Sequence, residues 1–201
     1  MTILFPTGSF YPAQTGGPDN TVYWITKALT RKGHKAMISS TDLGQPADTP
    51  RDQWLSTDYG EAMYTHNRIH YLPLKTIRHA LKRLQEAEVL HLSMITYPAA
   101  FLMAILNSWF YGKPMLWSSR GDLDPPMLLR SRKKKAFVLW LINTFVNKQK
   151  LWFHSTCDAE TGYIRDNFGK NAKVIQIPNY MELPKKVEVP KEKYLLFIGR
   201  I

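Results

Sequence analysis

Residues 3–40 read ILFPTGSFYPAQTGGPDNTVYWITKALTRKGHKAMISS, and this stretch decides the fold. Its first three residues are an apolar run that ends at a Pro-Thr-Gly turn, which predicts a short buried strand. Apolar residues then recur at helical spacing, at Val22, Ile25, Ala28 and Leu29. We expect Asp19 or Asn20 to cap this helix and Gly33 to end it. His34–Ser40 is then a second strand.

Strand, glycine-containing loop, helix and strand in this order make a βαβ unit, whose crossover helix leaves the two strands parallel. The alternation continues, with strands expected at Arg68–Leu72, Val89–Leu92, Pro114–Ser118, Leu151–Ser155 and Val174–Ile177. Helices are expected at Thr76–Glu86, Pro98–Phe110, Arg130–Lys150 and Asp158–Asn167. Asp42–Tyr59 reads as a long surface loop that is a candidate for substrate contact. The pattern predicts an α/β fold, Rossmann-like, with three α/β/α layers and a mostly parallel sheet of about seven strands.

The end of the chain has a different composition. We expect residues 1–183 to form the Rossmann-like domain. Pro184–Lys193 mixes Lys, Glu, Val and Pro without periodicity, which is typical of an interdomain linker. Residues 194–201, YLLFIGRI, then read as the first strand of a second, truncated domain.

Composition narrows the functional classes. The 27 Lys and Arg residues exceed the 16 acidic ones, and the net charge of +11 favours polyanionic partners such as phosphates, acidic glycans, anionic lipids or nucleic acid. The single cysteine, Cys157, cannot form an internal disulfide. We find neither an export signal nor an apolar run of the roughly 18 to 20 residues that a spanning helix needs. These features predict a cytoplasmic protein.

Four landmarks stand in an order that resembles family 4 of the retaining glycosyltransferases, which build capsular polysaccharide, lipopolysaccharide and similar glycans. They are Gly16-Gly17 after the first strand, Lys32–Lys35 (KGHK), Ser118–Leu123 (SSRGDL), and Ile177-Pro178-Asn179 followed by Phe197–Arg200 (FIGR). The resemblance implies a GT-B fold, in which a first Rossmann-like domain binds mainly the acceptor and a second binds mainly the nucleotide-sugar. By this resemblance the chain is the N-terminal, acceptor-side half of a hexosyltransferase-type enzyme.

The resemblance also implies transfer with retention of anomeric configuration and no metal or other cofactor. The paired-glutamate donor signature of the family would lie beyond Ile201, so we expect this polypeptide alone to transfer no sugar. Gly16 and Gly17 are expected to let backbone N–H groups approach a donor diphosphate at the following helix N-terminus, although a simple turn is the alternative. Arg200 matches the family arginine that reaches a donor phosphate.

Arg120 lies just beyond the strand that ends at Ser118, at the edge where open parallel sheets bind their ligands. Its guanidinium stays charged and cannot serve as a base. It can hold a phosphate or stabilise negative charge on the departing nucleotide, so we assign it as the catalytic candidate. The alternative is an ion pair with Asp122 or Asp124.

Acceptor contacts are expected from four residues near the same edge, namely His91, Ser118, Ser119 and Asp122. His91 is alternatively a core residue. Ser155, Glu160 and Asn179 match supporting positions of the family, and capping of the helix that begins near Asp158 is the simpler role for the first two. Tyr180 replaces the glycine that follows this asparagine in the family. We expect no metal site, because the spacing of His66 and His70 would suit two ligands on a helix, whereas Ile69–Leu72 reads as a strand and no third ligand is apparent.

A dense basic run, Arg130, Arg132, Lys133, Lys134 and Lys135, precedes the apolar segment Ala136–Leu141. This combination suits docking to the inner face of an anionic cytoplasmic membrane. The alternative is a helix with a solvated basic start and a buried remainder. The expected partners are therefore a nucleotide-sugar, a glycan or lipid-linked acceptor and an anionic membrane surface.

A non-catalytic α/β domain that binds phosphate, glycan or nucleic acid is the alternative function. No helix-turn-helix, zinc-finger, RNP or KH signature supports specific nucleic-acid binding.

Overall fold

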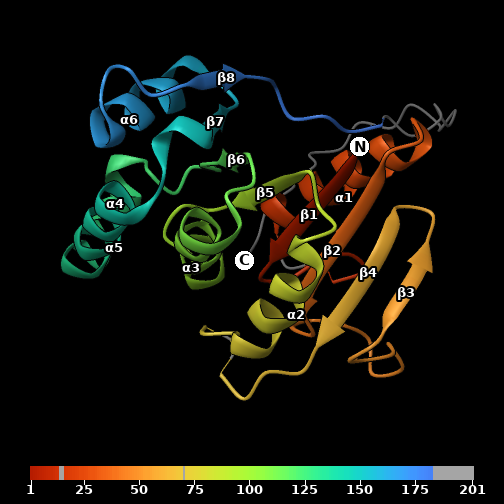
Figure 1. Cartoon of the computed structure of the whole chain (residues 1–201). Coiled ribbons are helices and arrows are strands. Elements are labelled where there is room, and N and C mark those ends of the chain that lie inside the picture. Colours follow the sequence, from red (N-terminus) through yellow and green to blue (C-terminus); the bar gives the residue numbers. More distant parts are fainter. Residues whose placement is uncertain (14–15, 70, 183–201) are drawn as a thin grey trace, which may run out of the picture.

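The computed structural model describes residues 1–13, 16–69 and 71–182. Within them, eight strands form one sheet in the order β3-β4-β2-β1-β5-β6-β7-β8 (Figure 1). The strands are β1 (Thr2–Thr7), β2 (Lys35–Thr41), β3 (Trp54–Thr57), β4 (Gly60–Thr65), β5 (Val89–Ser93), β6 (Met115–Ser118), β7 (Leu151–Ser155) and β8 (Val174–Gln176). Every neighbouring pair is parallel except β3 with β4. The predicted Rossmann-like, mostly parallel sheet is confirmed, with eight strands instead of about seven.

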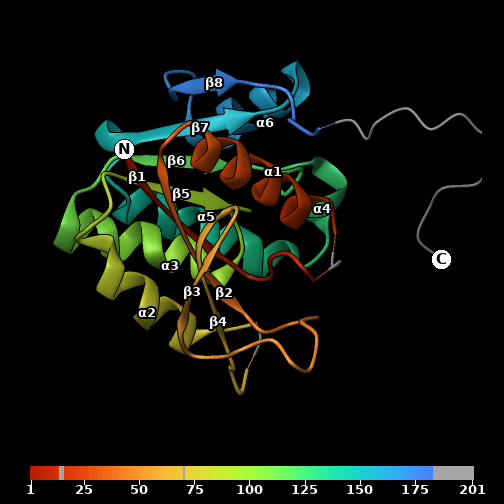
Figure 2. The same cartoon turned by 90° about the vertical axis from the view of Figure 1, so that its right-hand side faces the viewer.

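Helices cover both faces of the sheet. They are α1 (Gly17–Arg31), α2 (Leu74–Leu84), α3 (Pro98–Leu106), α4 (Pro125–Leu129), α5 (Arg132–Phe145) and α6 (Asp158–Phe168), with a π-helical turn η1 (Asn107–Tyr111) and a 3₁₀ turn η2 (Lys148–Lys150). Figures 1 and 2 show α1 separated from α2, α3 and α5 by the sheet. None of the described helices is both long and apolar enough to cross a membrane.

Two hydrophobic cores reflect the alternation of side chains along the buried strands. Phe5 and Ile38 point toward α1 and pack with Val22 and Tyr23. On the other face, a larger core contains Leu4, Met37, Leu90, Trp117, Met103, Ile142 and Ile164. Central parallel strands are apolar on both faces because helices cover both of them, and this explains why the strands read as apolar runs.

The sequence interpretation was wrong around β3 and β4. The expected loop Asp42–Tyr59 contains β3, and the strand expected at Arg68–Leu72 is a turn in its described part. Ile69 and Tyr71 are 60% and 70% exposed, so they contribute nothing to the core despite their strand-like spacing. The strand beside β2 on this side is β4, whose last four residues, Ala62–Thr65, are all buried.

The boundaries of α1 and α5 also differ from expectation. Helix α1 begins at Gly17, earlier than Asp19 or Asn20, because Pro18 fits the first helical turn, where a missing N–H costs nothing. The helix expected at Arg130–Lys150 corresponds to α5, which begins at Arg132 and ends at Phe145, and a separate short helix, α4, precedes it. Ser131 stands between them with a left-handed φ of 67°, which a continuous α-helix cannot contain.

The linker expected at Pro184–Lys193 and the strand expected at 194–201 lie outside the described residues.

Candidate functional site

The order of the strands reverses between β1 and β5. From β1 the chain turns to β2 on one side, and from β4 it crosses through α2 to β5 on the other side. A cavity of about 500 Å³ lies at this point. The end of β1, the start of α1 and the loop after β5 supply most of its lining, and the segments after β2 and β4 supply one residue each. The lining residues are Thr7, Gly8, Ser9, Gly16, Pro18, Asp19, Leu43, Tyr71, Ser93, Met94 and Tyr97. Doubly wound sheets bind their ligands at such a switch point, so this cavity is the candidate site.

The predicted glycine pair stands at the entrance to α1. Gly16 lines the cavity, and Gly17 is the first helical residue, with no atom within 4 Å of the position that a Cβ would take. Asp19 belongs to the same helical turn, lines the same cavity and accepts a short hydrogen bond from Ser9 Oγ. A diphosphate held by Gly16 would therefore meet a carboxylate, which works against the positive end of the helix.

Tyr97 forms one wall of the cavity and explains the need for a glycine at position 8. A Cβ added to Gly8 would lie 2.8 Å from Tyr97 Cζ, which is closer than carbon atoms approach one another. Burial raises the pKa of Tyr97, so its hydroxyl stays protonated at neutral pH. The close approach of the β1 loop to this ring fixes the position of the aromatic wall.

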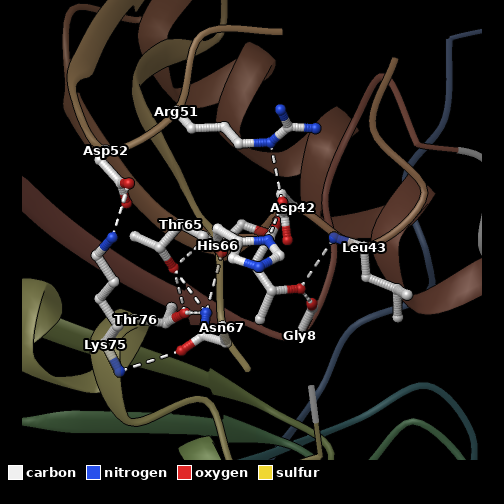
Figure 3. Close-up of polar contacts among 12 residues, drawn as sticks. Gly8, Asp42, Leu43, Arg51, Asp52, Thr65, His66, Asn67, Lys75 and Thr76 are labelled. Atoms are coloured by element: carbon white, nitrogen blue, oxygen red, sulfur yellow. Dashed lines mark hydrogen bonds and ion pairs between the residues drawn. The ribbon is translucent and has the colours of Figure 1, made fainter. Parts of the chain in front are cut away.

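A polar cluster stands where β2 and β4 end, next to Leu43 and Gly8 of the cavity lining (Figure 3). Asp42 Oδ2 lies 2.9 Å from both Arg51 Nε and His66 Nδ1. Burial alone would raise the pKa of Asp42, but the His66 and Arg51 contacts outweigh it and hold that pKa below its usual value. The backbone N–H of Leu43 donates to Thr41 Oγ1 at 3.2 Å. This network places Leu43 in the cavity wall, so the segment expected to contact substrate does reach the candidate site.

The loop after β6 holds Arg120 in a specialised conformation. Arg120 has a left-handed φ of 52°, and Gly121 follows with 74°. The loop starts beside the cavity, because the Met94 N–H donates to the Ser118 carbonyl at 3.0 Å. Arg120 Nη1 donates to Asn179 Oδ1 at 2.5 Å. The structure thus pairs Arg120 with Asn179, while Asp122 is engaged elsewhere.

The rest of the Arg120 guanidinium makes no hydrogen bond to the residues that the structure describes. Its Nε and Nη2 atoms are buried and make no hydrogen bond within the described part of the chain. Burial lowers the pKa of Arg120, and the charge of Glu160 partly offsets this effect. Unsatisfied buried donors on a cation are costly, and an anion that accepts from them would remove that cost.

Glu160 shapes the Arg120 loop from α6. Its Oε1 accepts from the Gly121 N–H at 2.7 Å, and its Oε2 accepts from the Thr156 N–H at 2.7 Å and from Thr156 Oγ1 at 2.8 Å. Burial would raise the pKa of Glu160, but these hydrogen bonds outweigh it and lower the pKa. Glu160 therefore both secures the start of α6 and supports the loop, whereas Ser155 Oγ contacts Thr161 Oγ1 at 2.7 Å.

Asp122 anchors the other end of the loop. Its carboxylate accepts from the Thr96 N–H at 2.6 Å and from Thr96 Oγ1, and it forms a 2.8 Å ion pair with Lys135. Only 3% of Asp122 is exposed. These contacts fit a positioning role that joins the cavity loop, the Arg120 loop and α5, and an acceptor contact by Asp122 stays a prediction.

His91 in β5 and Ser118 in β6 are buried on the face of the sheet that α1 covers. His91 Nε2 is 2.9 Å from Ser118 Oγ, Ser118 Oγ is 2.8 Å from His154 Nδ1, and His154 Nε2 is 2.8 Å from the Ile177 carbonyl. Since that carbonyl can only accept, neutral His154 donates from Nε2, Ser118 donates to its Nδ1, and His91 donates to Ser118. Burial, reinforced by the positive charge of Arg120, lowers the pKa of His91 to about 3.

The predicted residues thus fall into groups. Gly16 lines the cavity, while Arg120 and Ser119 stand in the neighbouring loop beside Glu160 and Asn179. His91 and Ser118 belong to the buried histidine network, and Arg200 lies outside the described residues. The sequence interpretation missed Asp19 and Tyr97 as parts of the site. The strand order could have indicated them, since both follow strands that flank the switch point.

Comparison with known proteins identifies a similar fold. No family model and no curated protein matches the sequence. The structure is similar to the crystal structure of Anabaena Alr3699/HepE in complex with UDP and glucose, with a TM-score of 0.56 and 14% sequence identity. The match covers 90% of this chain and 45% of that chain, so the protein described here spans less than half the length of its structural neighbour. The likeness confirms the α/β architecture.

Proposed function

We propose that this chain is the N-terminal, acceptor-side half of a GT-B-type glycosyltransferase, which moves a sugar from a nucleotide-sugar to a glycan or lipid-linked acceptor. The observation that carries the proposal is the pair of features at one sheet edge, namely the switch-point cavity and the adjacent loop that presents the unsatisfied guanidinium of Arg120. The neighbouring fold binds UDP and glucose, which are the two components of a nucleotide-sugar, and this supports the proposal.

The proposed role of Arg120 is to bind the donor diphosphate. Arginine binds phosphate through parallel N–H donors, and Nε and Nη2 of Arg120 form such a pair. As the bond between the sugar and the diphosphate breaks, negative charge grows on the departing nucleotide, and a fixed cation nearby stabilises it. Asn179 and the left-handed backbone hold the guanidinium in place. Stabilisation of the leaving group is thus the chemistry that we assign to this loop.

The cavity is proposed to bind the acceptor. Tyr71 and Tyr97 supply aromatic surface, while Asp19, Ser9 and Ser93 supply oxygen atoms. Aromatic rings beside hydrogen-bonding groups suit a ligand that has apolar faces and many hydroxyls, as a sugar ring does. Surface polysaccharide synthesis at the cytoplasmic side of a membrane, retention of configuration and independence from metal are further parts of the proposal.

The test is a transfer assay with the protein made from the complete gene. Membranes and glycans of the source organism serve as acceptors, and a panel of labelled nucleotide-sugars serves as donors. We expect incorporation of label by the complete gene product and none by the 201-residue chain. Incorporation by the 201-residue chain would overturn the assignment of this chain as half of an enzyme.

The alternative, a non-catalytic domain that binds phosphate or glycan, predicts a different pattern. A folded complete gene product would then bind ligand but transfer label from no nucleotide-sugar in the panel, and that result would contradict the proposed function.

A further inference from the structure

Five aromatic side chains form a connected row on the outer surface of α5 and η1. We call them the aromatic row: Phe137, Trp140, Phe145, Trp109 and Phe110. Successive ring centroids are 5.7, 6.1, 5.6 and 6.4 Å apart. The row reaches solvent, since Trp109, Phe110, Phe137 and Trp140 are 59%, 72%, 58% and 55% exposed. Clustered large aromatic rings of this exposure mark an interaction surface, whereas single exposed apolar residues do not.

The geometry of α5 directs the row away from the core. Ile142 is 1% exposed and faces the sheet side of the helix. Phe137 and Trp140 lie on the opposite side, together with Lys133, because residues four and three apart share one face of a helix. The alternative of a buried apolar remainder thus holds for Val138, Leu139 and Ile142, which pack in or against the core, but not for Phe137 and Trp140. This outer face presents a lysine at one end and aromatic rings along the rest.

The charged residues of α5 and of the segments that flank it all have one sign. Residues 125–157 contain no Asp or Glu and seven cations, namely Arg130, Arg132, Lys133, Lys134, Lys135, Lys148 and Lys150. Lys135 turns inward and pairs with Asp122, whereas the other six are exposed. The exposed basic residues thus stand at the start of α5 and beyond its end. An apolar surface with a basic border is complementary to a partner that has an apolar interior beneath a layer of negative charges.

We propose that the aromatic row and its basic border dock the protein on an anionic phospholipid membrane. The rings enter the zone between headgroups and acyl chains, where tryptophan is favoured, and the lysine and arginine side chains contact lipid phosphates. A second copy of the chain fits this surface poorly, because a two-fold pairing would bring the two basic borders together. The inference goes beyond the proposed function, since it holds whatever ligand the cavity binds.

The experiment measures binding of the purified 201-residue chain to vesicles by flotation. One set of vesicles contains phosphatidylcholine with phosphatidylglycerol, and the other contains phosphatidylcholine alone. The variants are Phe137→Ser with Trp140→Ser, and Lys133→Ser with Lys134→Ser. The matched control is Arg78→Ser with Lys82→Ser, which removes two exposed cations from α2. All four substituted positions of the test variants are exposed, so the fold should persist, and circular dichroism checks it.

We expect binding to the anionic vesicles only. The affinity of each test variant for these vesicles should fall by at least about tenfold. The affinity of the control should stay within about twofold of that of the unaltered chain. Brominated acyl chains should quench tryptophan fluorescence of the unaltered chain but hardly that of the Phe137→Ser, Trp140→Ser variant. Absence of binding to anionic vesicles would overturn the proposal, as would undiminished binding by the aromatic variant. A dimer of the chain that dissociates in the aromatic variant would also overturn it, because the occupant would then be a second copy.

Discussion

Arg120 combines a buried charge with incomplete hydrogen bonding, which is a feature of binding sites rather than of stable cores. We expect Arg120→Met in the complete gene product to lower kcat by about 100-fold or more, since a preorganised charge near the leaving group contributes on this scale. The unfolding free energy should stay equal or rise by about 1 kcal/mol, because an unsatisfied buried cation is removed. Transfer assays and chemical denaturation measure the two effects. A stability loss that parallels the activity loss would indicate a structural role instead.

Asp122 should behave in the opposite way. Asp122→Ala leaves Lys135 partly buried without its partner and removes the hydrogen bonds to Thr96. We expect the unfolding free energy to fall by about 3 kcal/mol or more, as measured by urea denaturation. Asp48→Ala, at an exposed loop position, is the control and should change it by less than about 0.5 kcal/mol. Equal effects of the two substitutions would refute the anchoring role.

His91 makes stability dependent on pH. Its pKa is lowered to about 3 in the folded chain and is about 6.5 in an unfolded chain. Below pH 6.5 the unfolded state therefore binds more protons, so stability is fully present above this pH and falls as the pH falls. We expect protonation of His91 in the unfolded chain to lower the free energy of unfolding by about 2 kcal/mol as the pH falls from 7 to 5. His91→Gln should flatten this decline and leave the profile parallel to that of the unaltered chain between pH 7 and 8. If the free energy of unfolding declined equally steeply below pH 6.5 in His91→Gln and in the unaltered chain, the assigned role of His91 would be contradicted.

Residue roles were only partly predictable from the sequence. The position of Arg120 at the carboxyl edge followed from the apolar strand before it, because strand ends share an edge in a parallel sheet. The direction of His91 did not follow, since a histidine in a strand can face solvent, a cavity or the core. Its Ser118 and His154 partners come from two neighbouring strands, and only the strand order brings these three together.

At the scale of elements, the β3–β4 hairpin depends on one glycine. Gly60 has a φ of 123°, and a Cβ there would lie 2.5 Å from the Ala36 carbonyl oxygen in β2. We expect Gly60→Ala to lower the unfolding free energy by about 2 kcal/mol or more, because both the backbone angle and the contact become unfavourable. Gly162→Ala in α6 meets no atom within 4 Å and should instead raise it by about 0.5 kcal/mol. Thermal denaturation compares the two, and similar effects would refute this explanation.

The same hairpin shows why the element prediction failed locally. A sequence pattern reports how side chains alternate, but it does not report which strand supplies the partner. Ile69 and Tyr71 have strand-like spacing but are exposed, whereas β4 pairs with β2 along its length and Gly60 allows the close approach to Ala36. The long βαβ units were predictable because each contains its own helix and turn, whereas the antiparallel edge strand depends on contacts made far away in the chain.

At the scale of the whole molecule, the strand order accounts for the location of the site. The reversal between β1 and β5 opens one sheet edge and places the start of α1, the β5 loop and the Arg120 loop around it. The aromatic row lies instead on α5 and η1. The proposed membrane surface and the candidate site use different residues, so separate variants can test them.

The central claim is that the sheet edge at β1 and β5 is the working site. Hydrogen–deuterium exchange of the complete gene product, alone and with the nucleotide-sugar or the acceptor that supports transfer, tests it most directly. We predict slower exchange on ligand binding in Gly16–Asp19, Ser93–Tyr97 and Ser119–Asp122, where the cavity and the Arg120 loop lie. Slower exchange confined to other parts of the protein, with these three segments unchanged, would contradict the account.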